Sequence, residues 1–262
     1  MGVDVGYSTA RLTTGIACLD GDQLSLVRTG TAWRSRESRI PAGFQPTLIA
    51  LDGPLLPRGA DELIRRPCEA VFIQAPFHNR CKPGLSHWGW GLELRRASAE
   101  ACAQFSRLLG SSASENEAVP VSRSGAIVEA FPNGFLGVLM PEEELLSAPR
   151  FKRGRRFDWL YDRLVTTARL EFVLSKGLEL PHAVRHRLRS ETDQELRAAL
   201  ICLLTAALAA QGTAAIIGEP SGGWFWLPPW SLWQQWATEA LNNAARAMAL
   251  KGQPLEKSSL DR

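Results

Sequence analysis

An aspartate inside a strand-like segment at the start of the chain constrains the fold more than any other feature. Asp4 lies within residues 2–7 (GVDVGY), whose small and β-branched residues predict a β-strand that ends near Tyr7. Aspartate is rare in strands, and a buried carboxylate needs a hydrogen-bonding partner, a counter-charge or a metal ion. Asp4 is therefore either a structural residue, paired with an arginine such as Arg11 or capping a turn, or part of a functional site.

The composition is typical of a globular protein rather than a membrane-spanning or disordered one. Hydrophobic residues make up 45% and charged residues 22% of the 262 residues. No apolar run reaches the roughly 18 residues that a membrane span needs. The chain begins with no basic segment followed by an apolar one, so we expect no secretion signal. An odd number of cysteines, five, favours free thiols in a reducing compartment. We therefore expect a cytoplasmic, single-domain protein spanning residues 1–262.

Arginine supplies most of the positive charge. Of the 30 basic residues, 25 are arginine, although the net charge is only +3. Arginine binds phosphate with two hydrogen bonds and stacks on bases, so the excess is compatible with a nucleic-acid partner. A GC-rich genome produces the same bias, and the net charge is far below that of a DNA-coating protein. Composition alone therefore leaves the partner open.

The order of the predicted strands indicates an α/β fold with a mixed central sheet. Residues 11–18 and 23–28 flank an Asp-Gly dipeptide that is typical of tight hairpins, so the first three strands should form an antiparallel meander. Apolar residues at 47–51 and 125–131 predict later strands that are buried and parallel. Helices predicted between the strands would flank this sheet.

A long helix and a hairpin follow late in the chain. Residues 193–211 place leucines at helical spacing, and Asp193 is a candidate N-cap of this helix. Residues 214–217 and 223–227 then predict a hairpin.

Two regions differ from this α/β pattern. Residues 58–110 form a predicted insertion rich in arginine, histidine, cysteine and tryptophan. Residues 228–262 form a Trp-rich tail, in which Trp230, Trp233 and Trp236 recur at helical spacing. Such a stripe packs either in the core or against a partner, so a homodimer through this tail is one expectation.

Acidic residues occur in or after the predicted strands and at the start of the long helix. Carboxylates crowded in a partly buried site repel one another unless divalent cations hold them, and oxygen ligands suit Mg²⁺ or Mn²⁺. Two such ions can activate water and stabilise the leaving oxygen in phosphodiester hydrolysis. This strand order, with acids at these places, is typical of the ribonuclease-H-like fold. The expected metal ligands and catalytic residues are Asp4, Asp52, Glu129 and Asp193.

Several ordered segments resemble an uncharacterised family of predicted ribonuclease-H-like nucleases. The resemblance covers roughly residues 1–230 and implies a ribonuclease-H-like core with Asp4, Asp52 and Glu129 as its acidic cluster. The segments are GVDVGYS at 2–8, LDGPL at 51–55, RPCE at 66–69, VEAFPNGFLG at 128–137, and ELRAALICLLTAAL followed by AAIIGEPSGG.

The chain departs from this family pattern at the long helix. Similar sequences tend to place an aspartate just before the small apolar run, where this chain has residues 197–199 (RAA). Asp193 and Glu195 are then the nearest acids. Asp193 is therefore either the fourth metal ligand or only an N-cap.

Basic and polar residues of the insertion and its surroundings are candidate contacts to substrate phosphates and bases. A zinc site built from Cys68, His78, Cys81 and His87 is an alternative, although the spacing is irregular and no second ligand pair follows. The expected substrate-binding residues are Arg11, Arg66, Arg80, Lys82, His87 and Lys152.

Two other functions remain open beside a metal-dependent nuclease. In a nucleotide-binding domain of the actin and sugar-kinase type, Asp4, Gly6, Ser8 and Thr9 would form a phosphate loop, although no second such loop is present. In a non-catalytic binding protein that retains the fold, the carboxylates would be structural. Whether the acids converge on one solvent-reachable point discriminates between these functions.

Overall fold

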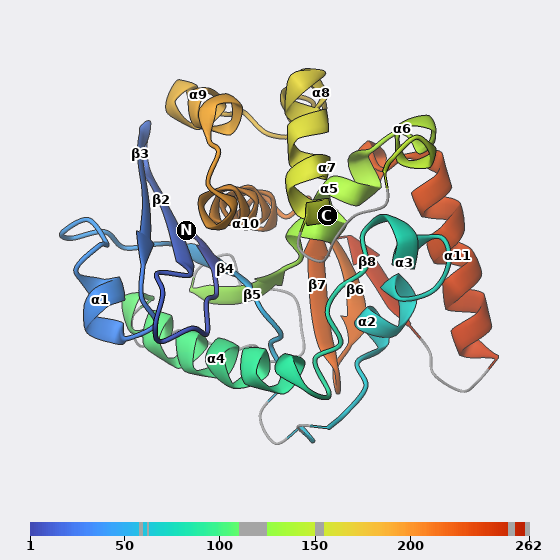
Figure 1. The fold of residues 1–262 in the computed structure, drawn as a ribbon, viewed down its shortest axis with the longest axis horizontal. Helices are drawn as coiled ribbons and strands as arrows, with labels where there is room; N and C mark the ends of the chain where they lie inside the picture. Colours follow the sequence, from blue (N-terminus) through green and yellow to red (C-terminus); the bar gives the residue numbers. More distant parts are fainter. Residues whose placement is uncertain (58–59, 62, 110–124, 150–154, 251–254, 260–262) are drawn as a thin grey trace.

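The protein is built on one mixed sheet (Figure 1), and the computed structural model describes residues 1–57, 60–61, 63–109, 125–149, 155–250 and 255–259. Within these residues the sheet has eight strands in the order β3-β2-β1-β4-β5-β7-β6-β8. The strands are β1 (Gly2–Asp4), β2 (Thr14–Asp20), β3 (Gln23–Thr29), β4 (Leu48–Asp52), β5 (Ala126–Ala130), β6 (Ala215–Glu219), β7 (Gly223–Leu227) and β8 (Glu256–Ser259).

The strand directions confirm part of the prediction. β1, β2 and β3 form the predicted antiparallel meander, and β1, β4, β5 and β7 are mutually parallel neighbours. The hairpin predicted at residues 214–217 and 223–227 is confirmed as the antiparallel pair of β6 and β7, since only a few residues join these two strands. The general expectation of parallel later strands is wrong for β8, which pairs antiparallel with β6.

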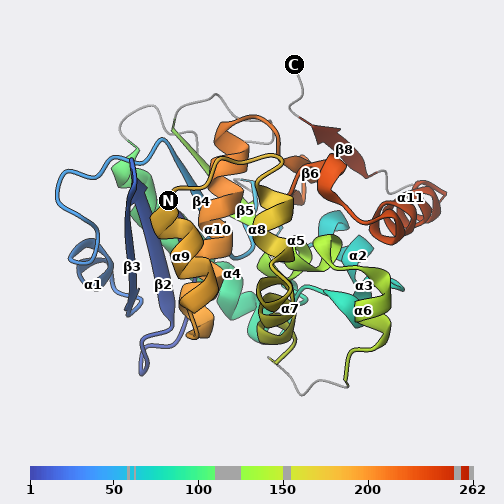
Figure 2. The same cartoon turned by 90° about the horizontal axis from the view of Figure 1, so that it is seen from above.

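Helices cover both faces of the sheet. Figure 1 shows α4 on one side and α10 on the other, and Figure 2 shows α10 lying over the sheet. The helices are α1 (Trp33–Glu37), α2 (Pro67–Phe72), α3 (Phe77–Arg80), α4 (Trp90–Phe105), α5 (Pro132–Leu139), α6 (Glu142–Leu146), α7 (Arg155–Thr166), α8 (Arg169–Leu174), α9 (His182–Ser190), α10 (Gln194–Ala210) and α11 (Gln235–Ala249), with 3₁₀ turns at Ser106–Leu108 and Trp230–Leu232.

Two glycines let α10 lie directly on the first strands. A Cβ atom at Gly2 would lie 2.1 Å from the Leu203 amide nitrogen, and one at Gly15 would lie 2.2 Å from the Glu195 carbonyl oxygen. The backbone of α10 therefore touches the backbone of β1 and β2. Asp193 caps the helix, since its Oδ1 accepts a hydrogen bond from the Leu196 amide at 3.1 Å. As a result, the first turn of α10 lies close to the carboxyl end of β1.

The tryptophan stripe of the tail packs mainly in the core. Trp233 and Trp236 are buried and donate their indole N–H groups to the carbonyls of Pro228 (2.8 Å) and Met140 (2.9 Å). These side chains are therefore used within the chain, and the predicted homodimer through this tail gains no support from them. All five cysteines lie in the described part of the chain, are buried and form no disulfide. Each described helix is too short or too polar to span a lipid bilayer.

Candidate functional site

Asp4 and Asp52 are the last residues of the neighbouring parallel strands β1 and β4. They are register partners, with their Cα atoms opposite each other. Val3 and Leu51, one residue earlier, belong to the smaller core against α4. Because successive side chains of a strand point to opposite faces, Asp4 and Asp52 face the side covered by α10. The strand ends thus bring two carboxylates together beneath the start of this helix.

The two carboxylates line a pocket of about 790 Å³. Six separate parts of the chain form its walls, namely the end of β1 with the following loop, the end of β4, and the starts of α4, α5, α7 and α10. Glu195, in the first turn of α10, is a third acid of the pocket. The lining residues are Asp4, Val5, Gly6, Tyr7, Ser8, Thr9, Arg11, Thr13, Asp52, Trp90, Pro132, Asn133, Phe157, Gln194, Glu195 and Ala198.

The pocket acids are electrostatically crowded. Burial raises the pKa of Asp4, and the negative charges of Asp52, Glu195 and Asp193 raise it further, while Arg28 lowers it. Burial and the charge of Glu129 raise the pKa of Asp52 to about 7. Neither the Asp4 nor the Asp52 carboxylate forms a hydrogen bond or ion pair with a described residue. The negative charges of Asp4 and Asp52 are thus held close together without a directly bound positive group.

Arg28 of β3 separates the roles of the two acids at the start of α10. Its Nη1 lies 2.6 Å from Asp193 Oδ2, and its Nη2 lies 3.4 Å from Glu195 Oε1. Asp193 therefore has one oxygen on Arg28 and the other on its own helix, and it does not line the pocket. Asp193 is thus the N-cap of α10, and Glu195 takes the place in the pocket that we predicted for Asp193. Helix geometry could have indicated this, because an N-cap side chain bends back onto its own first turn.

Glu129 is not brought together with Asp4 and Asp52. It is in register with Leu51 rather than Asp52, so its side chain points to the opposite face of the sheet. There Arg66 binds both of its oxygens, with Nη1–Oε1 at 2.7 Å and Nη2–Oε2 at 2.5 Å. The Leu55 amide also donates to Oε2 at 2.8 Å. Both carboxylate oxygens of the buried Glu129 therefore already accept hydrogen bonds. The expected cluster of Asp4, Asp52, Glu129 and Asp193 is not formed.

Arg66, besides binding Glu129, belongs to a buried network of hydrogen bonds that links the insertion to the sheet. Its Nη1 lies 3.3 Å from Glu69 Oε1, and the Ser86 amide donates to Glu69 Oε2 at 3.1 Å. The Nε of Arg95 donates to the Ser86 hydroxyl at 2.9 Å. All of these residues are buried. Arg66 therefore has a structural role, which corrects its predicted contact with substrate.

The other predicted substrate-binding residues are dispersed. Arg11 is exposed and lines the acidic pocket. Arg80 forms an ion pair with Glu142 at 2.6 Å and lies over the Trp236 ring at 4.3 Å, so it is engaged in structural contacts. Lys82 is exposed and His87 is partly buried, and neither lines the pocket. Lys152 lies outside the described residues.

The residues of the pocket fit one hard divalent cation better than two. Within the described ranges, no three His, Cys, Asp or Glu side chains are placed to hold one metal ion together. The carboxylates of Asp4 and Asp52 are nevertheless free acceptors, and Mg²⁺ is commonly bound through one or two protein carboxylates with water completing its shell. The alternative zinc set of Cys68, His78, Cys81 and His87 gains no support from this geometry, since these side chains are not among any such group in the described ranges.

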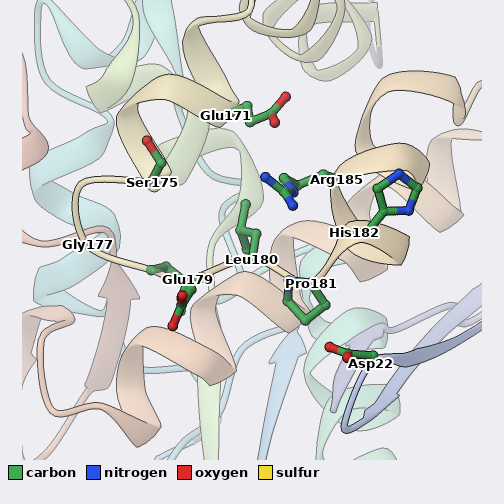
Figure 3. Close-up of a pocket in the computed structure, with 10 residues that line it drawn as sticks. Asp22, Glu171, Ser175, Gly177, Glu179, Leu180, Pro181, His182 and Arg185 are labelled. Atoms are coloured by element: carbon green, nitrogen blue, oxygen red, sulfur yellow. The ribbon is translucent and has the colours of Figure 1, made fainter.

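A second pocket, of about 740 Å³, shares no lining residue with the first. Figure 3 shows Glu171 from α8, Arg185 and His182 from α9, and Asp22 from the turn between β2 and β3. Glu171 is already paired with Arg189. The mixture of charges around this pocket does not converge on one type of ligand, and we assign it no function.

Comparisons of the chain with models of protein families, with curated proteins and with solved structures found no significant match.

Proposed function

We propose that this protein is a metal-dependent hydrolase that cleaves nucleic-acid phosphodiester bonds, with Mg²⁺ or Mn²⁺ held by Asp4 and Asp52. The observation that carries the proposal is the register pair of Asp4 and Asp52 at the floor of a solvent-reachable pocket. Two adjacent carboxylates without hydrogen-bonding partners are costly unless a cation neutralises them. A divalent cation is the ligand that most directly removes this cost.

The strand arrangement supports a ribonuclease-H-like fold as part of this proposal. A meander of three antiparallel strands is followed by the parallel strands β4 and β5, and the two acids end the adjacent strands β1 and β4. The long helix α10 covers the same face and adds Glu195. This is the layout in which acids from the first strand, the fourth strand and a late helix meet.

Four charged residues of the pocket would have roles in this chemistry. Asp4 and Asp52 would hold the cation, which when bound polarises a phosphoryl oxygen and lowers the pKa of water. Glu195 would accept a proton from the attacking water, since it lines the pocket and makes only a long contact of 3.4 Å to Arg28. Arg11, exposed at the pocket, would contact a substrate phosphate. A cavity of about 790 Å³ is large enough for a nucleotide.

A cleavage assay tests the proposal. The purified protein is incubated with end-labelled single-stranded and double-stranded DNA and RNA, in Mg²⁺, in Mn²⁺ and in EDTA. We expect cleavage only with metal, and loss of cleavage in Asp4→Asn and Asp52→Asn. Asp22→Asn is the matched control, because Asp22 is an exposed aspartate of the β2–β3 turn. This variant should cleave at the wild-type rate. Absence of cleavage by the wild type, or equal cleavage by Asp4→Asn, rejects the proposal.

Nucleotide binding is a second candidate function. Gly6, Ser8 and Thr9 follow Asp4 and line the same pocket, as a phosphate-binding loop would. The Gly6 amide, however, donates to the Thr14 hydroxyl at 3.3 Å and so is already engaged. A thermal-shift measurement with ATP and Mg²⁺ separates the two functions, because a ligand that binds only the folded state raises the melting temperature. A clear shift without nuclease activity would favour nucleotide binding.

A further inference from the structure

Two aromatic rings lie at the opening of the acidic pocket and remain exposed. The side chains of Tyr7 and Trp90 have exposed fractions of 48% and 66%. Their ring centroids are 6.5 Å apart, with an angle of 30° between the ring planes. Both residues line the pocket that contains Asp4 and Asp52. Large exposed aromatic side chains next to a pocket mark a binding surface rather than core packing.

The backbone holds these two rings in place from separate elements. Tyr7 follows β1 after Gly6, where a Cβ atom would lie 2.2 Å from the Thr13 hydroxyl oxygen. Trp90 begins α4 directly after Gly89, whose φ of +57° belongs to the left-handed region that favours glycine. The two glycines therefore permit the close turn and the helix start that bring the rings together.

The exposed pair suits a flat aromatic ligand. Ring centroids 6.5 Å apart lie within the range of directly interacting aromatic pairs, so Tyr7 and Trp90 form one exposed aromatic surface. A planar ring can stack on the exposed part of this surface. Exposed Arg11 lines the same pocket and supplies a positive charge for a phosphate attached to such a ligand. Nucleotides combine these two chemical features.

We propose that Tyr7 and Trp90 bind an unpaired nucleobase, so that the substrate of this site is single-stranded nucleic acid. The inference rests on the proposed nuclease function, and it names the class of substrate. Stacking on aromatic side chains tolerates every base, because each base has a π-face. In a duplex these faces are covered by neighbouring base pairs, so a paired strand cannot occupy the rings without unstacking.

Binding is measured separately from cleavage to test this inference. Fluorescence anisotropy of labelled 12-nucleotide single strands and matching duplexes is recorded with Mg²⁺ in an Asp52→Asn background, which does not cleave if the proposed function is correct. We expect single strands to bind more tightly than duplexes. Trp90→Ala should weaken single-strand binding by about 5- to 150-fold, the range measured for loss of one stacked base. Trp90→Phe, which keeps a π-face, should recover most of it.

Trp88→Ala is the matched control. Trp88 lies two residues before Trp90 and has a similar exposed fraction of 65%, but it does not line the pocket. Its replacement should leave binding unchanged, and melting curves should show that both alanine variants remain folded. Equal binding by Trp90→Ala and Trp88→Ala, equal affinity for single strands and duplexes, or no binding of either would overturn the inference.

The two proposals fail in different ways. If single strands bind through Trp90 but the wild type cleaves nothing with Mg²⁺ or Mn²⁺, the proposed nuclease function fails and the nucleobase site stands. If the wild type cleaves and Trp90→Ala binds and cleaves equally well, the nuclease function stands and the nucleobase site fails.

Discussion

Asp4 and Asp52 lie opposite each other at the ends of the parallel strands β1 and β4, and their carboxylates face the same pocket. Sheet register fixes this relationship, because parallel neighbours end at the same edge of the sheet. Burial and nearby negative charge raise the pKa of both carboxyl groups, for Asp52 to about 7. The pair of ionised carboxylates therefore destabilises the metal-free protein.

Stability of the metal-free protein should fall as pH rises from about 4 to about 7. The pKa of Asp52 is near its ordinary value in the unfolded chain and about 7 in the folded protein, so the folded state binds more protons in this interval. Thermal unfolding in EDTA should show a falling melting temperature over this range. Asp52→Asn should flatten the decline, whereas Asp22→Asn should not. An unchanged pH profile in Asp52→Asn would contradict the pKa assignment.

Mg²⁺ or Mn²⁺ should raise the melting temperature more at pH 8 than at pH 5. Protons compete with the cation for the carboxylates, so binding strengthens once Asp4 and Asp52 are ionised. The measurement is a thermal-shift titration at both pH values, with Ca²⁺-free buffers. Asp4→Asn should remove the pH-dependent part of the shift. An equal shift at pH 5 and pH 8 would place the cation elsewhere.

Breaking the contact between Arg66 and Glu129 should destabilise the fold without changing metal affinity. Arg66→Met leaves Glu129 buried without its counter-charge, which typically costs about 3–5 kcal/mol in the free energy of unfolding. The double variant Arg66→Met with Glu129→Leu removes both charges and should lose less. Urea unfolding measures the stability, and calorimetric titration with Mn²⁺ measures the affinity of the folded variants. A specific loss of Mn²⁺ affinity in folded Glu129→Gln would instead make Glu129 a ligand.

Glu195 rather than Asp193 should matter for catalysis. Glu195→Gln should lower the cleavage rate by at least about tenfold, as expected for loss of a general base. Asp193→Asn should retain most activity, because asparagine also caps helices well and Asp193 does not line the pocket. Cleavage rates at saturating metal test this pair. The reverse order of the two effects would restore Asp193 as the functional acid.

The close approach of α10 to the sheet should depend on Gly15. Gly15→Ala places a Cβ atom 2.2 Å from the Glu195 carbonyl oxygen, so helix and strand must separate. Overpacking of this type typically costs about 1–3 kcal/mol in the free energy of unfolding. Gly84→Ala is the control, because no atom lies within 4 Å of its added Cβ. Equal stability of the two variants by urea unfolding would contradict this packing.

Local sequence patterns predicted the parts of the fold that depend on local chemistry. The Asp-Gly turn predicted the hairpin of β2 and β3, and the buried apolar runs predicted β4 and β5. The hairpin of β6 and β7 was also predicted, whereas β8 and its antiparallel pairing with β6 were not. Strand direction depends on how each connection crosses the sheet, which periodicity along a single strand does not reveal.

The candidate site was also predicted only in part. Asp4 and Asp52 were recognisable because an acid in or directly after an apolar strand needs an explanation. The face on which Glu129 lies depends on strand register to a single residue, and a shift of one residue reverses the face. The pairing of Glu129 with Arg66 joins residues 63 positions apart. No spacing rule in one sequence predicts such a contact.

We propose above all that Asp4 and Asp52 hold a divalent cation between them. The most direct test is a crystal of the protein soaked in MnCl₂, with data collected at a wavelength where manganese scatters anomalously. We expect an anomalous peak within about 2.0–2.6 Å of carboxylate oxygens of both residues, the range for hard cations bound by oxygen. A fully soaked crystal with manganese bound elsewhere and none at this pair would contradict it.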